Sequence, residues 1–76
     1  MSNFASVLLN FQSIVRQGDI HHVKRASELL GRWTKPVFET AVVTAFYEGA
    51  NFEILSFLAN KAGRKLEKKN NVTYLS

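Results

Sequence analysis

The chain has 76 residues, of which 46% are hydrophobic and 21% are charged, and its formal net charge is +4. A chain this short forms one domain of modest stability, because it buries only about 60% of the surface that its unfolded form exposes. Cysteine is absent, which excludes disulfides, thiolate zinc sites and cysteine nucleophiles, and favours a reducing, cytoplasmic location.

The first predicted helix runs from about Ser2 to Gln17. We expect neither a signal peptide nor a membrane span here, since no lysine or arginine precedes the apolar residues and polar residues interrupt them. Gly18 ends this helix, and Asp19 is a suitable N-cap for a second helix that ends at Gly31. The apolar residues of the first helix recur at the spacing of one buried face, at Phe4, Val7, Leu8, Phe11, Ile14 and Val15.

A third helix is predicted from about Lys35 to Glu48, with Thr34 as its candidate cap. Pro36 fits the first turn of this helix, because the N–H group that proline lacks would have no helical partner there. Apolar residues cover most of the circumference, which predicts a central helix that packs on two sides and buries Phe46. These residues are Val37, Phe38, Ala41, Val42, Val43, Ala45 and Phe46.

A fourth helix should follow the cap residue Asn51 and end at Gly63. The tail beyond it could extend this helix by one turn, and its last residues, "VTYLS", favour β structure but have no obvious partner strand. We therefore predict an all-α fold of two stacked helical hairpins, four helices in all, with a short basic C-terminal tail. The expected boundaries are about 2–31 for hairpin one, 32–35 for the joint, 36–66 for hairpin two and 67–76 for the tail.

The two halves of the chain repeat one pattern. Each half is predicted to be a helix, a tight glycine turn and a second helix, which is the hairpin unit of stacked helical repeats. A lone hairpin cannot cover its own hydrophobic face, whereas two stacked hairpins can share one. The pairs aligned by a shift of 31 residues include Gly18 with Gly49, Val7 with Phe38, Ile14 with Ala45, Val15 with Phe46, and Ala26 with Phe57.

The segments "RQGDIHHVKRASELLG" and "YEGANFEILSFLANKAG" resemble the ankyrin repeat, in which a first helix ends in a glycine, a short polar step follows and a second helix carries aliphatic pairs. The resemblance covers about sixteen residues in each half and implies stacked hairpins that present a recognition surface. The T-P-L-H box and the β-turn of that family are absent. The alternative is an ordinary four-helix domain whose glycine turns align by chance.

Basic residues concentrate on or just after the second and fourth predicted helices. In a stacked arrangement these helices lie side by side, so their basic faces would merge into one surface. That surface suits phosphates or carboxylates and favours a protein partner with an acidic surface, whereas the alternative is a solvated face that keeps the protein soluble. The candidate binding residues are Lys24, Arg25, Arg32, Trp33, Lys61, Arg64, Lys65 and Lys68.

Trp33 has two interpretations at the joint between the hairpins. It either closes the core over the joint or serves as an exposed aromatic anchor between Arg32 and Lys35, a composition typical of binding hot spots. We favour the first interpretation.

The segment "VKRASELLGRWTKPVFETAVV" could instead form a helix-turn-helix, with the third helix reading DNA, as in a small basic transcriptional regulator. That helix offers Glu39, Thr40 and Thr44 but no internal Arg, Asn or Gln for base edges. This composition favours the third helix as part of the core, and DNA binding is the alternative function.

We predict no enzyme activity, no cofactor and no metal site. His21 and His22 are adjacent, so on a helix they point about 100° apart and cannot chelate one metal together. The chain has no cysteine, no phosphate-binding glycine loop and no Ser-His-Asp order. The sequence therefore predicts a small protein-binding module that docks on a partner protein and modulates or inhibits it. Nucleic acid and a second copy of the chain are the alternative partners, and a membrane is not expected.

Overall fold

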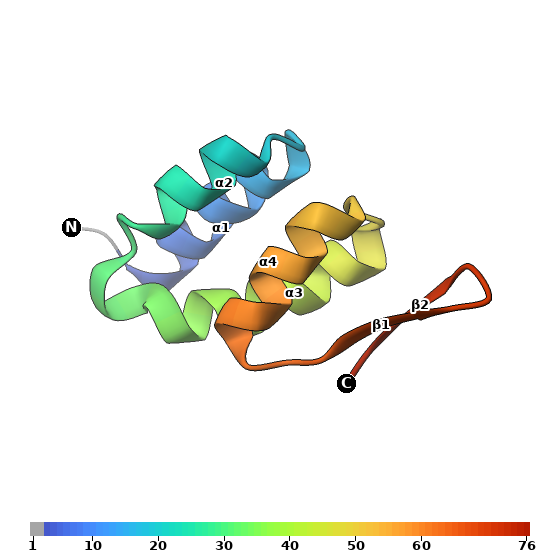
Figure 1. Ribbon diagram of the computed structural model, residues 1–76. Coiled ribbons are helices and arrows are strands. Elements are labelled where there is room, and N and C mark those ends of the chain that lie inside the picture. The colour runs from blue at the N-terminus through green and yellow to red at the C-terminus, as the bar shows by residue number, and fades with distance from the viewer. Residues whose placement is uncertain (1–2) are drawn as a thin grey trace.

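A computed structural model describes residues 3–76 (Figure 1). These residues are mostly helical, as predicted, and end in a two-stranded antiparallel sheet. The strands lie in the C-terminal tail, and residues 3–62 contain none. In chain order the elements are α1 (Phe4–Arg16), α2 (Ile20–Ser27), the single 3-10 turn η1 (Gly31–Trp33), α3 (Thr34–Glu48), α4 (Phe52–Ala62), β1 (Leu66–Lys69) and β2 (Val72–Leu75).

Side-chain caps fix where most helices begin. Asp19 Oδ1 accepts a hydrogen bond from the backbone N–H of His21 at 3.0 Å, and Asn51 Oδ1 accepts one from Ile54 at 2.9 Å, so both predicted caps are confirmed. The expected start of the first helix at Ser2 lies outside the described residues. Asn3 caps α1 instead, through a bond that Ser6 N–H donates to Asn3 Oδ1.

The joint between α2 and α3 differs from the prediction. α2 ends at Ser27 rather than at Gly31, because the Ser27 hydroxyl donates a 2.6 Å hydrogen bond to the Lys24 carbonyl and the following amides bond three residues back. The prediction that Thr34 caps the third helix was wrong. It is the first residue of α3, and its hydroxyl donates to the Gly31 carbonyl at 2.6 Å.

α1 packs against α2, and α3 packs against α4, so each half of the chain forms a helical hairpin (Figure 1). The hairpins meet mainly through α1 and α3, and α2 also contacts α4. Gln12 Nε2 donates to Thr44 Oγ1 at 3.1 Å, and Arg16 binds Glu48 through bonds of 2.9 and 3.0 Å; both pairs are 32 residues apart. Corresponding parts of α1 and α3 therefore lie beside each other. The separation of 32 residues between these partners is close to the shift of 31 residues that aligns the two halves of the sequence.

α3 is central, since it packs against α1 on one side and α4 on the other. Phe38 is 1% exposed, and its ring makes edge contacts with those of Phe11 and Phe57. Phe46, expected to be buried, is only half-buried, because it packs against the outside of the core rather than within it. The core therefore lies between the two hairpins.

The tail forms a β-hairpin and does not extend α4. Gly63 adopts a left-handed conformation that ends the helix, as predicted. The partner strand that the sequence analysis lacked is the first half of the tail itself, since β1 pairs with β2 in the register Leu66 to Leu75. Asn70 and Asn71 both have positive φ, of 51° and 65°, as a two-residue type I′ turn requires.

Candidate functional site

Two lysines from different helices lie close to one aromatic ring. Lys24 on α2 places its Nζ atom 5.8 Å from the ring centroid of Phe57 on α4, and Lys61 on α4 places its Nζ atom 5.7 Å from the same centroid. Both distances lie within the range of a cation–π interaction. We refer to these three residues as the Phe57 cluster.

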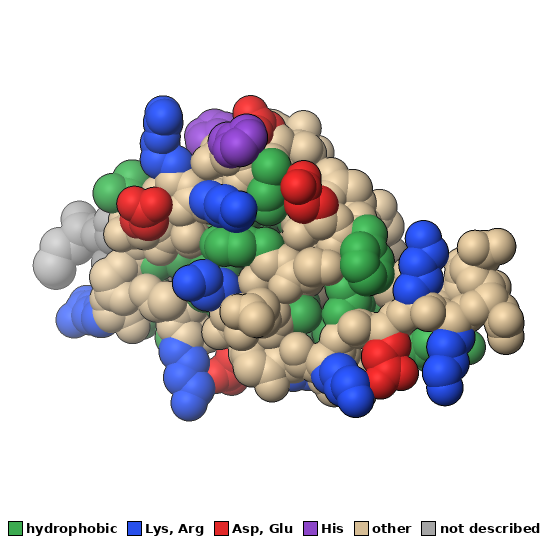
Figure 2. All heavy atoms as spheres, viewed as in Figure 1, with side chains coloured by type: hydrophobic (Ala, Val, Ile, Leu, Met, Phe, Trp, Pro, Cys, Tyr) green, Lys and Arg blue, Asp and Glu red, His purple; other side chains and the backbone are tan. Residues whose placement is uncertain are grey.

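The helices dictate this arrangement. Phe57 and Lys61 are four residues apart on α4, so they share one face of that helix. Lys24 reaches the ring because α2 lies against α4. Phe57 itself is half-buried, and its ring and that of Phe38 form a T-shaped pair with a centroid distance of 6.0 Å. On the face shown in Figure 2, hydrophobic side chains lie between Lys and Arg side chains.

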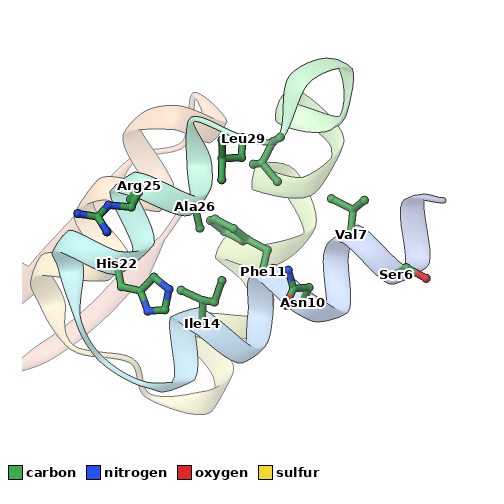
Figure 3. Close-up of a pocket in the computed structure, with 10 residues that line it drawn as sticks. Ser6, Val7, Asn10, Phe11, Ile14, His22, Arg25, Ala26 and Leu29 are labelled. Carbon is green, nitrogen blue, oxygen red and sulfur yellow. The ribbon is translucent and has the colours of Figure 1, made fainter. Parts of the chain in front are cut away.

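Arg25 lies one position beyond Lys24 but belongs to a different surface. It lines a groove between α1 and α2 with a volume of about 470 Å³, together with His22 of α2 (Figure 3). The α1 side of this groove is formed by Val7, Phe11 and Ile14, among others. The two basic residues that are adjacent in the sequence therefore serve two separate surfaces.

Arg32 and Trp33 form a local pair at the joint. The guanidinium carbon of Arg32 lies 4.7 Å from the Trp33 ring centroid. Trp33 is half-buried and packs against Phe4, with ring centroids 5.9 Å apart. These contacts support the interpretation that Trp33 covers the core over the joint.

The remaining predicted binding residues are engaged by the tail. Arg64 Nε donates to the backbone oxygen of Ser76 at 2.8 Å, and Lys65 Nζ lies 3.1 Å from Glu67 Oε1. Lys68, on β1, places its Nζ atom 5.7 Å from the ring centroid of Phe52. The structure thus separates these three residues from the Phe57 cluster and assigns two of them contacts that hold the base of the β-hairpin.

Phe57 is the residue that the sequence analysis missed, because it entered there only as the repeat equivalent of Ala26. The spacing from Phe57 to Lys61 was the available indication, since residues four apart on a helix interact. A second lysine from another helix could be recognised only once α2 and α4 were known to touch.

The ion pair between Arg16 and Glu48 links the two hairpins through α1 and α3. The hydrogen bonds from Arg16 lower the pKa of the Glu48 carboxyl below its ordinary value, and the same bonds raise the pKa of Arg16. Both side chains are about half exposed, at 51% and 44%. Within residues 3–76, no three His, Asp or Glu side chains gather where they could hold a metal ion.

No helix formed by residues 3–76 has the length and apolar composition needed to cross a membrane. Comparisons of the chain with protein-family models, with curated proteins and with solved structures found no match.

Proposed function

We propose that this protein is a small, non-enzymatic binding module that docks on a partner protein through the Phe57 cluster and modulates or inhibits that partner, in the cytoplasm. The observation that carries the proposal is the pair of lysines, from two helices, within cation–π distance of one half-buried aromatic ring. A rigid aromatic side chain supplies apolar contact area at low entropic cost, and such residues dominate binding energy at protein interfaces.

The charge of the cluster favours a partner with an acidic surface. Among residues 3–76, the ion pairs join Arg16 to Glu48 and Lys65 to Glu67, so within this range no carboxylate pairs with Lys24 or Lys61. Carboxylates on a partner would meet two ammonium groups beside an apolar ring. Such charges accelerate association and fix orientation more than they add affinity.

The repeated hairpins support the same proposal. Stacked helical hairpins, of which the ankyrin type is the one this chain resembles, build a recognition surface from side chains of neighbouring units. Here Lys24 comes from the first hairpin, whereas Phe57 and Lys61 come from the second.

The position of α3 weighs against DNA reading by a helix-turn-helix. A recognition helix must enter the major groove with one side free, but α3 packs against both α1 and α4 and buries Val37, Phe38 and Val42. Its exposed residues include Glu39, whose carboxylate would repel the phosphate backbone.

Affinity capture with charge-reversal variants tests the docking face. The immobilised full chain is exposed to a lysate of its source cells, as wild type, as Lys24→Glu/Lys61→Glu, and as the matched control Lys65→Glu/Lys68→Glu. The expected result is a protein that the wild type and the control retain and that the Lys24/Lys61 variant loses. A partner lost equally from both double variants, or from neither, would contradict the proposal.

A parallel binding assay addresses the nucleic-acid alternative. Fluorescence anisotropy on a mixed-sequence duplex at two salt concentrations should show weak binding that falls steeply with salt, because it consists only of counterion release. Tight, sequence-dependent binding at physiological salt would replace the proposed function with DNA recognition.

A further inference from the structure

The two stacked hairpins leave one face uncovered at each end of the stack. Some residues on these two faces are more exposed than the residues that the shift of 31 aligns with them in the other hairpin. On the side of α3 that faces α1, Phe38 and Ala41 are 1% exposed and Ala45 is 3% exposed. With the shift of 31 residues, these positions correspond in α1 to Val7, Asn10 and Ile14. Hairpin two is covered there by hairpin one, whereas no described part of the chain covers the same side of hairpin one.

The open side of hairpin one is the groove between α1 and α2. Its lining in Figure 3 shows Val7 and Ile14 from α1 and Leu29 just beyond α2 around the Phe11 ring. Leu29 borders this groove and is 83% exposed, so its side chain is open to contact with another molecule. We call this surface the leading face.

The opposite end of the stack carries an exposed aromatic pair. On α1, Val15 and Arg16 contact hairpin two, and the shift of 31 residues aligns them with Phe46 and Tyr47 of α3. Val15 is 5% exposed, but Phe46 is only half-buried and Tyr47 is 82% exposed, with the two rings in edge contact at 5.6 Å. The β-hairpin packs against α4 through β1 and leaves Tyr47 open. We call the surface of Phe46 and Tyr47 the trailing face.

We propose that the leading face of one copy of this chain docks on the trailing face of a second copy, so that the hairpins of successive copies continue one helical stack. The internal contact of hairpin one with hairpin two is the template, since Val7 and Ile14 correspond to Phe38 and Ala45, and Phe46 corresponds to Val15, all of which are buried there. Leu29 and Tyr47 correspond to the exposed Asn60 and Arg16 and lie at the rims of the two faces, where Leu29 lines the groove and Tyr47 contacts Phe46. Phe46 and Tyr47 of one copy would then cover the groove lined by Val7, Ile14 and Leu29 of the next.

This contact is heterologous, because the two surfaces differ, and that property makes it testable. An isologous dimer would use the same surface on both copies. In a head-to-tail contact, by contrast, each copy keeps one free face, so assembly continues with concentration. The proposal involves the ends of the stack and is independent of the Phe57 cluster, which lies on the α2–α4 side.

Sedimentation velocity over a concentration series measures the association. The wild-type mass should rise above the 8.6 kDa of the single chain as concentration increases. Leu29→Asp, on the leading face, and Tyr47→Lys, on the trailing face, should each weaken association by about tenfold or more, which corresponds to ~1.4 kcal/mol or more of contact free energy. Both side chains are highly exposed, so the variants should fold, as circular dichroism can verify.

Matched substitutions at other exposed positions provide the controls. Leu9→Asp on α1 and Tyr74→Lys on β2 make the same chemical changes at side chains that are 63% and 52% exposed but lie outside both faces. These variants should associate like the wild type. If Tyr74→Lys abolishes association and Tyr47→Lys does not, the β-hairpin makes the contact and the assignment of the trailing face is overturned.

Mixing the two face variants gives the decisive result. Tyr47→Lys retains an intact leading face and Leu29→Asp retains an intact trailing face, so an equimolar mixture should form a one-to-one dimer that neither variant forms alone. A wild type that stays monomeric throughout the series overturns the proposal. So does a mixture that shows no dimer, since that result indicates an isologous contact or none.

Discussion

Gln12 and Arg16 lie one turn apart on α1, and each bonds to the residue 32 positions later on α3. Gln12 is 8% exposed, and its amide is satisfied by the Thr44 hydroxyl, so this hydrogen bond removes the cost of burying a polar group between the hairpins. The Arg16–Glu48 pair is more exposed and is bidentate, which adds geometric definition more than free energy. Together the two contacts fix the register of one hairpin on the other.

The Glu48 carboxyl should report this contact through its titration. Its pKa in the folded protein lies below the ordinary value because Arg16 donates hydrogen bonds to it, so the pair stabilises the fold above the unfolded-state pKa. That stabilisation is lost as the pH falls through the lower, folded-state pKa. In an NMR pH titration, Arg16→Gln should raise the pKa of Glu48, whereas Arg25→Gln, on the other side of hairpin one, should leave it where it is in the wild type. An unchanged pKa in Arg16→Gln would show that the ion pair does not form in solution.

At the scale of the elements, left-handed glycines end the helices that the sequence predicted best. Gly49 has φ of 77°, and its backbone N–H bonds back into α3, so the chain reverses at once toward Asn51, the cap of α4. Gly63 ends α4 in the same way, with φ of 69°. Glycine suits both positions because it adopts the left-handed conformation readily, whereas other residues lose free energy of folding there.

Replacing Gly49 measures that cost directly. A Cβ atom added at Gly49 would meet nothing within 4 Å, so Gly49→Ala should destabilise the fold by conformational strain alone, about 1–2 kcal/mol. Gly49→Asn should cost less, since asparagine tolerates the left-handed region. Thermal unfolding of the three proteins provides the comparison. Equal midpoints for the alanine variant and the wild type would mean that the turn relaxes to another conformation.

The elements also show where sequence patterns stop being informative. Apolar periodicity predicted α1, α3 and α4 closely, and Asx caps predicted the starts of α2 and α4, because both are local properties of the chain. The early end of α2 depends on the Ser27 hydroxyl, which could equally have pointed to solvent. The β-hairpin was missed although Asn70 and Asn71 are residues that favour its turn, since β1 reads as a charged continuation of α4 until its pairing with β2 is known.

For the whole molecule, the β-hairpin determines the shape, and the stacking of the helical hairpins determines which charges come together. The described chain is elongated, at 45 × 21 × 17 Å, because the β-hairpin projects beyond the helices (Figure 1). The sequence predicted that basic residues of the second and fourth helices would meet, and Lys24 and Lys61 do so around Phe57. It could not predict that Arg64 and Lys65 would be engaged at the base of the tail, because those contacts depend on where Ser76 returns.

The central claim is that α2 and α4 together form the surface around Phe57, and nuclear Overhauser effects at its ring protons test this most directly. Lys61 lies four residues away on the same helix, so it should give effects in any folded α4 and serves as the internal control. Lys24 can approach the ring only if the two hairpins stack as described. We predict effects from the Phe57 ring to the side-chain methylenes of both lysines. Effects to Lys61 alone, in a protein whose α2 and α4 are both folded, would contradict the account.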